Sequence, residues 1–286
     1  MRELDYIPNE LARGMFRQKS GIIAMLVPSI RHMFFSSLAH YIEQELYANG
    51  YKLMLCSSDD KIEREADYMR IFRSNLVDGV ILGVTHLDDT VYEKFKKPLV
   101  TTDYRVNDTI PVVVSDNNQG GALAAEAFIR NRRKHVIQVV GNSDKQVLSH
   151  LRHLRFESAL NASGIDVSRV MIKWNEFDYD AYEELAKNIL DSRTEIDGIM
   201  AADMPACAFL KAALRLGRRV PEDFSVVAYD GTYLADANIM NMTAIVQPLH
   251  EMAVKTVEVM MALIDGKPLD TSFIQLPIAF RQGETA

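Results

Sequence analysis

The feature that most constrains the fold is an alternation of short apolar runs with longer segments of helical periodicity. It begins after Gly21, with an apolar run at 22–27 and helical spacing at 34–48, and ends with a helical segment at 249–264. Strands that alternate with helices of this length form right-handed βαβ crossovers and a parallel sheet. The pattern therefore predicts an α/β fold.

The alternation restarts after Arg132, which indicates two halves. The first half has predicted strands at 22–27, 52–56, 79–82, 99–101 and 112–114, with helices at 34–48, 63–73, 90–95 and 122–130. The second has strands at 136–140, 170–173, 198–201 and 225–229, with helices at 147–161, 179–190 and 206–216. This number of strands is larger than one open sheet usually contains. We therefore expect two Rossmann-like halves.

Composition and charge exclude several classes of protein. The 286 residues are 48% hydrophobic and 25% charged, which is ordinary for a globular protein. No apolar run reaches the ~20 residues of a membrane span, and no signal segment opens the chain. The two cysteines, Cys56 and Cys207, lie far apart, as fits a reducing compartment. We expect a cytoplasmic protein with no membrane partner. Its net charge of −7 argues against strong DNA binding by this chain alone.

Signatures of catalysis and of metal binding are missing from the sequence. It contains no His-Glu-x-x-His, Gly-x-Ser-x-Gly, Walker or Gly-x-Gly-x-x-Gly motif. His150 and His153 share a helix face, but no acidic or thiol residue is spaced to complete a metal site with them. The sequence therefore predicts a protein that is not an enzyme and that holds neither a metal nor a cofactor.

Polar and aromatic residues concentrate where the predicted strands end. In open α/β folds, ligands bind beyond the carboxyl ends of the strands. These ends carry the segments 28–35, 57–60, 83–86, 103–107, 115–118, 141–144, 174–178, 202–203 and 229–233. Carboxylates and amides beside flat rings suit a polyhydroxylated ligand such as a sugar. Any single Asp or Asn there could instead only cap a helix or shape a turn. The cluster as a whole favours a ligand cleft.

The N-terminal residues resemble a known hinge. Residues 4–15 read Leu-Asp-Tyr-Ile-Pro-Asn-Glu-Leu-Ala-Arg-Gly-Met, which is similar to the Leu-x-Tyr-x-Pro-Asn-x-x-Ala-Arg-x-Leu hinge of the lactose/galactose-repressor family. In that family the hinge joins a helix-turn-helix DNA reader to an effector-sensing core. The resemblance implies that residues 1–19 are this hinge and that the reading head is absent from the chain. It further implies that the hinge enters the minor groove of DNA through Asn9, Ala12, Arg13 and the apolar wedge Met15. A disordered basic tail is the alternative.

Motifs in the core extend the resemblance over nearly the whole chain. Residues 115–120, Ser-Asp-Asn-Asn-Gln-Gly, are similar to Asp-Asn-x-x-Gly, and 152–156, Arg-His-Leu-Arg-Phe, to Arg-x-x-Gly-Phe. Residues 201–206 look like Ala-Ala-Asn-Asp-x-x-Ala, and 225–231 like Ser-Val-Val-Gly-Phe-Asp-Asp. An aromatic pair follows the first strand, as in the family's Asn-Pro-Phe-Phe. The resemblance implies effector contacts at Phe34, Phe35, Asp116, Arg152, Phe177, Asp203 and Asp230.

Five positions depart from the family's motifs. His32-Met33 replaces the usual lead-in to the aromatic pair, and Arg155 replaces a glycine. Ala202 stands where the family has a hydrogen-bonding asparagine, and Gly231 replaces a second acid. The loss of the asparagine removes a donor and an acceptor from the cleft, so the effector could be altered.

The resemblance also implies a domain organisation. The family has two subdomains of periplasmic-binding-protein type joined by three crossovers, so the helix at 249–264 returns to the first half. We expect an N-terminal subdomain at 20–132 plus 248–272 and a C-terminal subdomain at 133–247 plus 273–286.

The function that the resemblance implies is a dimeric, sugar-responsive transcription regulator, in most cases a repressor. A sugar or sugar phosphate would bind in the cleft and control operator binding by the full-length homodimer. Within the family, the pattern most resembles the sucrose-operon repressors. The alternative is a solute-binding protein that delivers a sugar to a transporter, and a protein corepressor in place of a small effector stays open.

Overall fold

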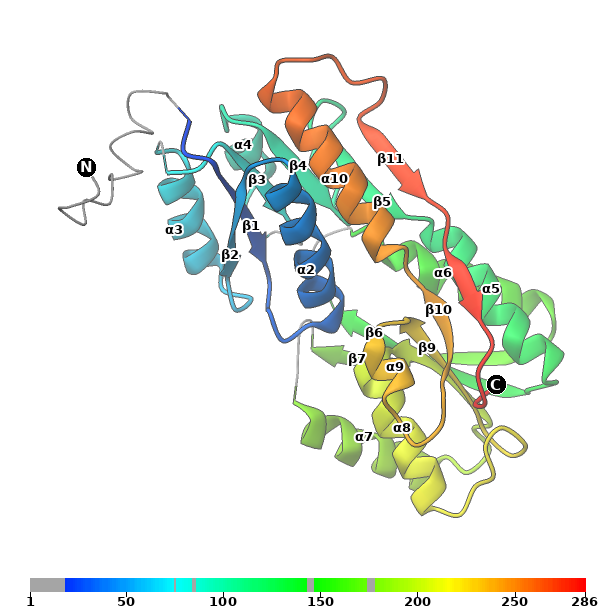
Figure 1. Ribbon diagram of the computed structural model, residues 1–286. Coiled ribbons are helices and arrows are strands. Elements are labelled where there is room, and N and C mark those ends of the chain that lie inside the picture. The colour runs from blue at the N-terminus through cyan, green and yellow to red at the C-terminus, as the bar shows by residue number, and fades with distance from the viewer. Residues whose placement is uncertain (1–18, 75, 84–85, 143–146, 174–177) are drawn as a thin grey trace, which may run out of the picture. The chain divides into compact units, whose positions relative to one another are not determined.

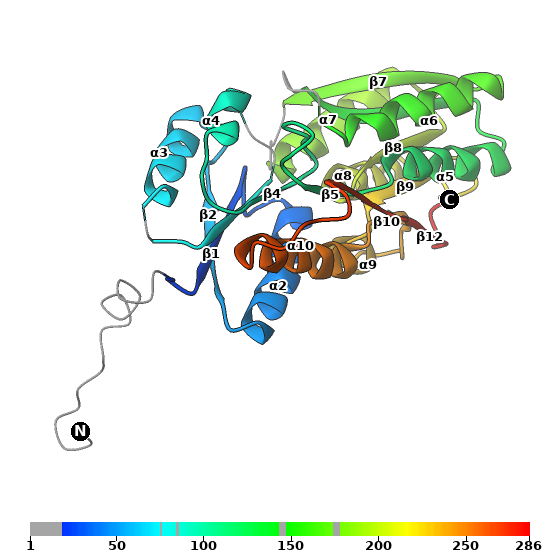
Figure 2. The same cartoon turned by 90° about the horizontal axis from the view of Figure 1, so that it is seen from above.

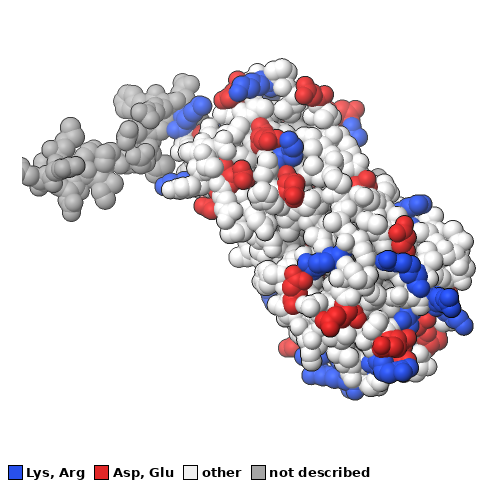
Figure 3. Space-filling model, turned by 45° about the vertical axis from the view of Figure 1, so that its right-hand side comes forward, with Lys and Arg blue, Asp and Glu red and all other residues white. Residues whose placement is uncertain are grey.

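The chain forms two α/β units, each with a six-stranded sheet. The structure is a computed structural model, and it describes residues 19–74, 76–83, 86–142, 147–173 and 178–286. Phe177 and the hinge residues Asn9, Ala12, Arg13 and Met15 lie outside the described residues. Among the described residues, no helix has the length and apolar character to cross a membrane. Acidic and basic side chains are interspersed on the face shown in Figure 3.

Unit 1 comprises the chain up to Ser29 together with Leu38–Val113 and His250–Ile274. Its sheet has the order β11-β5-β4-β3-β1-β2. Figures 1 and 2 show α2 and α10 on one face of this sheet and α3 and α4 on the other. The elements are β1 (Ile22–Val27), α2 (Met33–Ala48), β2 (Lys52–Ser57), α3 (Ile62–Phe72), β3 (Gly79–Leu82), α4 (Asp89–Glu93), β4 (Leu99–Thr102), β5 (Val112–Ser115), α10 (Leu249–Ile264) and β11 (Phe273–Leu276).

The helix α10 packs closely on the sheet of unit 1. A Cβ atom at Gly79 would lie 2.4 Å from the sulfur of Met260, so the Met260 side chain would have to shift if β3 carried a larger residue there. Tyr41 of α2 and His250 of α10 meet edge to face at 5.4 Å. The late helix therefore belongs to the first half of the fold, as the family resemblance implied.

Unit 2 comprises Ile30–Ser37, Val114–Leu249 and Gln275–Ala286. Its sheet has the order β12-β10-β9-β8-β6-β7, in which only the short strand β12 is antiparallel to its neighbour. The elements are α5 (Asn117–Arg130), β6 (His135–Asn142), α6 (His150–Ala162), β7 (Asp166–Lys173), α7 (Tyr179–Ser192), β8 (Gly198–Ala202), α8 (Asp203–Arg215), β9 (Ser225–Asp230), α9 (Tyr233–Asp236), β10 (Thr243–Val246) and β12 (Ala279–Arg281).

The period of two along the strands of unit 2 builds a core on each face of its sheet. Val226 packs with α7 and α8, whereas the next residue, Val227, packs with α5 and α6. Ile199 and Met200 divide between the two faces in the same way. Both faces are covered by helices, so the strands are continuously apolar, as buried parallel strands require.

The boundary between the units differs from the one that we expected. We placed α5 in the N-terminal subdomain, which would end at residue 132, but unit 2 already begins at Val114. The reason is that Phe128 of α5 is fully buried against Phe156 of α6 and against the second sheet. The chain passes between the units at Val113–Val114, Leu249–His250 and Ile274–Gln275, and Ile30–Ser37 also groups with unit 2. These passages fit the three crossovers of the family fold.

Sequence analysis missed three short strands and the short helix α9, and it started α5 too late. The strands β10, β11 and β12 have three or four residues each, too few to show a period. The helix α5 begins at Asn117, because the side chain of Asp116 accepts a hydrogen bond from the Gln119 amide at 2.9 Å and caps it.

A histidine clamped by two carboxylates joins three segments of unit 1. The Nε2 atom of His86 lies 3.1 Å from Asp60, and its Nδ1 atom lies 3.3 Å from Glu65. Glu65 is only 1% exposed and also accepts hydrogen bonds from the His86 amide and the Tyr92 hydroxyl. The hydrogen bonds to Asp60 and then to Glu65 raise the pKa of His86 to about 9, although burial opposes them.

We expect this clamp to stabilise the chain in a pH-dependent way. Because the folded pKa of about 9 exceeds the usual histidine value of 6.5, the contribution is complete below about pH 6.5 and disappears as the pH rises through about 9. Its size is about 3 kcal/mol. The test compares the melting temperatures of the wild type and of His86→Gln from about pH 6 to about pH 10. A difference that stays constant across this range would contradict the charged clamp.

Candidate functional site

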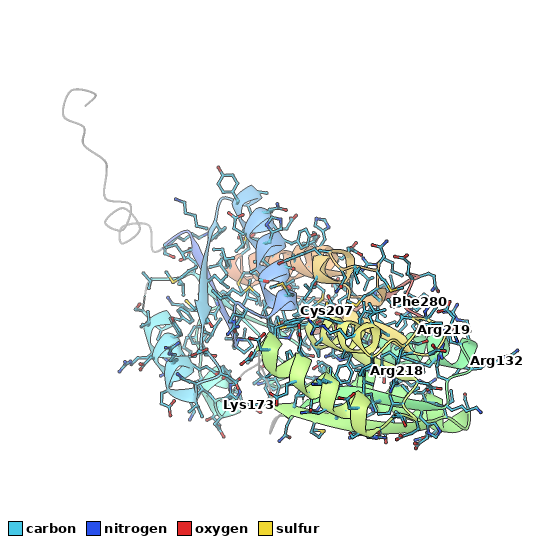
Figure 4. The ribbon with its side chains drawn as sticks, turned by 90° about the horizontal axis from the view of Figure 1, so that it is seen from below. Arg132, Lys173, Cys207, Arg218, Arg219 and Phe280 are labelled. Atoms are coloured by element: carbon cyan, nitrogen blue, oxygen red, sulfur yellow. The ribbon has the colours of Figure 1, made fainter. Side chains whose placement is uncertain are left out.

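A pocket lies in unit 2 at the carboxyl ends of β6, β7, β8 and β9. Its volume is about 780 Å³ when the open mouth is included. Figure 4 shows Lys173 at this end of the unit, with Arg132, Arg218 and Arg219 at the opposite end. The lining residues are His32, Met33, Val139, Gly141, Ser149, His150, Arg152, His153, Ile172, Lys173, Tyr182, Ala202, Asp203, Met204, Pro205 and Asp230.

Arg152 is held between an aromatic ring and a carboxylate. Its guanidinium carbon lies 4.3 Å from the centroid of the Tyr229 ring, which is 1% exposed. Its Nη1 atom lies 3.7 Å from Oδ1 of Asp230. A planar guanidinium stacked on a ring keeps its remaining donors in a fixed direction. Arg152 can therefore offer paired N–H donors to hydroxyl or anionic oxygens in the pocket.

The buried side chain of His153 holds Arg152 by a hydrogen bond. His153 contacts the Gln138 side-chain oxygen through Nδ1 at 2.9 Å, and the Nε–H group of Arg152 donates to its Nε2 atom at 3.4 Å. Burial, followed by the charge of Arg152, keeps the pKa of His153 well below its usual value. A neutral ring with its proton on Nδ1 satisfies both contacts at once, since Gln138 then accepts and Arg152 donates.

Asp230 ends β9 in a backbone conformation that L-residues rarely adopt, with φ at 116°. Its side chain is 4% exposed, and Oδ1 accepts a hydrogen bond from the Gln247 amide at 2.7 Å. The Gln247 side-chain oxygen in turn accepts from the Ser115 hydroxyl at 2.5 Å. Strained backbone at a ligand pocket is typical of a functional residue that its surroundings hold in place.

Asp203 lines the pocket and also binds the backbone that follows Asp230. One of its oxygens accepts from the Gly231 amide at 3.1 Å, and the other accepts from the Thr232 amide at 2.7 Å and its hydroxyl at 2.6 Å. Burial and then the charge of Asp230 raise the pKa of Asp203 to about 7, against these hydrogen bonds. Asp203 lines the pocket, but it also fixes the turn that follows Asp230.

Two further imidazoles line the pocket near Arg152. Burial lowers the pKa of His32, and Arg152 adds to this effect while Asp230 opposes it. Burial also lowers the pKa of His150. The Nδ1 atom of His32 accepts from the Phe34 amide at 3.3 Å, and its ring meets the Phe35 ring edge to face. At neutral pH the pocket therefore presents neutral imidazoles beside the Asp230–Arg152 pair, with Asp203 and Lys173 also in its lining, a set that suits hydroxyl groups.

Gly120, the glycine of the Asp-Asn-x-x-Gly motif, and its neighbour Gly121 let α5 approach the residues that hold Arg152. A Cβ atom at Gly120 would lie 2.1 Å from the Tyr229 hydroxyl, and one at Gly121 would lie 2.3 Å from the carbonyl oxygen of Arg152. The two glycines thus allow α5 to approach both the Tyr229 ring, on which Arg152 packs, and the helix α6, which contains Arg152.

The structure brings only some of the predicted site residues together. Arg152, Asp203 and Asp230 line one pocket. Phe34 and Phe35 are buried beside its rim as an edge-to-face pair, and Asp116 caps α5 without lining the pocket. The roles of all seven residues in binding stay predictions.

Sequence analysis missed several of the pocket's residues. Lys173 could have been found, because it is the last residue of a strand. The supporting roles of Gln138, His153 and Gln247 depend on contacts that no local motif reveals. Among the residues that the structure describes, no cluster of three or more His, Cys, Asp or Glu side chains could hold a metal ion.

Known proteins resemble this chain along its whole length. Residues 125–286 match the family described as periplasmic binding protein-like domain. The sucrose operon repressor of Streptococcus mutans is 32% identical over 291 residues, covering 100% of this chain and 87% of that protein. The chain belongs to the lactose/galactose-repressor family. The ribose operon repressor of Halalkalibacterium halodurans is another member, 30% identical over 286 residues and covering 100% of this chain and 85% of that protein.

The fold of the family is also found among solved structures. A periplasmic binding protein/LacI transcriptional regulator from Alkaliphilus metalliredigens, complexed with D-xylulofuranose, superposes with a TM-score of 0.84 at 23% identity. The match covers 93% of this chain and 99% of that one.

One departure from the family motif has a structural cause. Gly231 has φ at 64°, and a Cβ atom there would lie 2.8 Å from the Cα atom of Val246. The second acid of the family motif would be strained at this position. Ala202, the other departure nearby, lines the pocket with a methyl group.

Proposed function

We propose that this chain is the effector-sensing core of a sugar-responsive transcriptional repressor. The observation that carries the proposal is the pairing of Arg152 with Asp230 over the Tyr229 ring, at the positions where the family motif implies effector contacts. The names of the curated relatives, a ribose and a sucrose operon repressor, support a sugar as the effector. The apolar lining between these polar groups suits the faces of a sugar ring.

The output of this sensor is operator binding. In the proposed mechanism the effector shifts the population of states in which both hinges of a homodimer enter the minor groove through Asn9, Ala12, Arg13 and Met15. By linkage, an effector that weakens operator binding is itself bound more weakly by the operator complex. The protein would act in the cytoplasm, where the DNA lies. The relatives are operon repressors, which does not favour the alternative of a transporter's solute-binding protein or of an enzyme.

A thermal-shift screen tests this proposal. D-ribose, D-fructose, sucrose, cellobiose and their phosphates are added at millimolar concentration, and the melting temperature is measured. A ligand that binds only the folded form raises it, by an amount that corresponds to about 2.7 kcal/mol at one hundred times the Kd. We expect a saturable rise with one class of sugar. Melting curves that no sugar or sugar phosphate moves would contradict a sugar sensor.

A further inference from the structure

A continuous series of side-chain contacts leads from the pocket to Ser115. Oδ1 of Asp230 lies 3.7 Å from Nη1 of Arg152, and it accepts a hydrogen bond from the side-chain amide of Gln247 at 2.7 Å. The other end of the same amide group accepts from the Ser115 hydroxyl at 2.5 Å. Ser115, Asp230 and Gln247 are 2%, 4% and 7% exposed, so water competes little for these bonds.

The two polar residues beyond Asp230 lie next to points where the chain passes between the units. Ser115 closely follows the passage at Val113–Val114, and Gln247 closely precedes the passage at Leu249–His250. The third passage is held differently, since the Gln119 side-chain oxygen accepts from the Ile278 amide at 2.9 Å and the Asp116 backbone amide donates to the Leu276 carbonyl at 2.7 Å. Apart from the two passages that flank Ile30–Ser37, two of the remaining three are thus bonded, through one side chain, to a residue of the pocket.

We propose that Gln247 is a positioning residue that couples occupancy of the pocket to these two passages. A ligand hydroxyl that binds Asp230 and Arg152 redistributes the donors around Oδ1. The side-chain amide group of Gln247 is planar and is hydrogen-bonded at both ends. A change in its hydrogen bond to Asp230 therefore also changes its hydrogen bond to Ser115. This inference rests on the proposed function for the identity of the ligand, but the bonded series itself does not depend on it.

The fold does not need this side chain to keep its strands in register. The Gln247 backbone amide donates to the Asp230 carbonyl at 3.0 Å, and β9 and β10 are paired along their length. Gln247→Ala therefore removes the series of side-chain bonds and leaves the strand pairing in place. Gln119→Ala is the matched control, because it removes a glutamine that holds the third passage and does not line the pocket.

The first experiment measures amide hydrogen exchange without any ligand. In Gln247→Ala we expect exchange to become roughly 10-fold faster at Asp116 and Asn117, because a buried hydrogen-bonded network next to them is lost. Gln119→Ala should instead affect the amide of Ile278. Exchange at Asp116 and Asn117 that matches the wild type in Gln247→Ala would overturn the proposal.

The second experiment is a double-mutant cycle, with D-ribose and sucrose as the probes. If Gln247 acts through Asp230, Gln247→Ala weakens binding of the active probe roughly 10-fold, as expected for a bond to a charged group. The same change should have no effect when Asp230 is already Asn, and Gln119→Ala should bind like the wild type. Additive losses would overturn the proposal. If the wild type binds neither these probes nor any sugar of the thermal-shift screen, the proposed sugar sensor fails, whereas hydrogen exchange still tests whether Gln247 holds the segment at Ser115.

Discussion

Arg152→Ala is expected to abolish the response of the melting temperature to sugars. The change removes the guanidinium that Tyr229, Asp230 and His153 hold in place. Loss of two charge-assisted hydrogen bonds lowers the affinity roughly 100-fold or more, since each contributes about 1.5–3 kcal/mol. Titration calorimetry with the sugar that gives the largest shift in the wild type measures this loss.

The neighbouring Arg155 provides a matched control for this prediction. It lies on the same helix, but its side chain is exposed and does not line the pocket. Arg155→Ala removes the same charge from the chain and should bind the sugar as the wild type does. Equal losses in the two variants would mean that the net charge of α6, and not the Arg152 geometry, governs binding.

Gly121→Ala is expected to destabilise unit 2 and to disturb the pocket at the same time. The added methyl group would lie 2.3 Å from the carbonyl oxygen and 3.0 Å from the carbonyl carbon of Arg152, which are backbone atoms that cannot rotate away. The helix α6 must therefore move, and overpacking of this kind costs about 3 kcal/mol. Urea unfolding measures the free energy of unfolding, and calorimetry measures the accompanying loss of sugar affinity.

Asn118→Ala separates this packing effect from helix propensity. Both changes add a good helix former to α5, but Asn118 is exposed. We expect Asn118→Ala to leave the free energy of unfolding within about 0.5 kcal/mol of the wild type. A Gly121→Ala variant as stable as Asn118→Ala would show that α5 and α6 are not in the close contact described above.

Much of the candidate site followed from where residues stand relative to strand ends. The strand-end rule placed Asp203 and Asp230 in candidate segments, and the family motifs selected these two residues and Arg152; all three line the pocket. The rule could not distinguish a residue that faces a ligand from one that fixes a turn. Asp203 lines the pocket and also holds Gly231 and Thr232, a task that is set by the path of the chain after β9.

The sequence by itself determined the alternation of strands and helices, the presence of two halves and the limits of α10 at Leu249–Ile264. These features depend on hydrophobic periodicity, which is local. Only the tertiary structure decided that α5 packs in unit 2, that Gln138 and His153 orient Arg152, and that Gln247 joins Asp230 to Ser115. Such contacts join residues far apart in the chain, so no short pattern records them. These contacts form because the completed fold buries polar groups, and each buried polar group requires a hydrogen-bond partner.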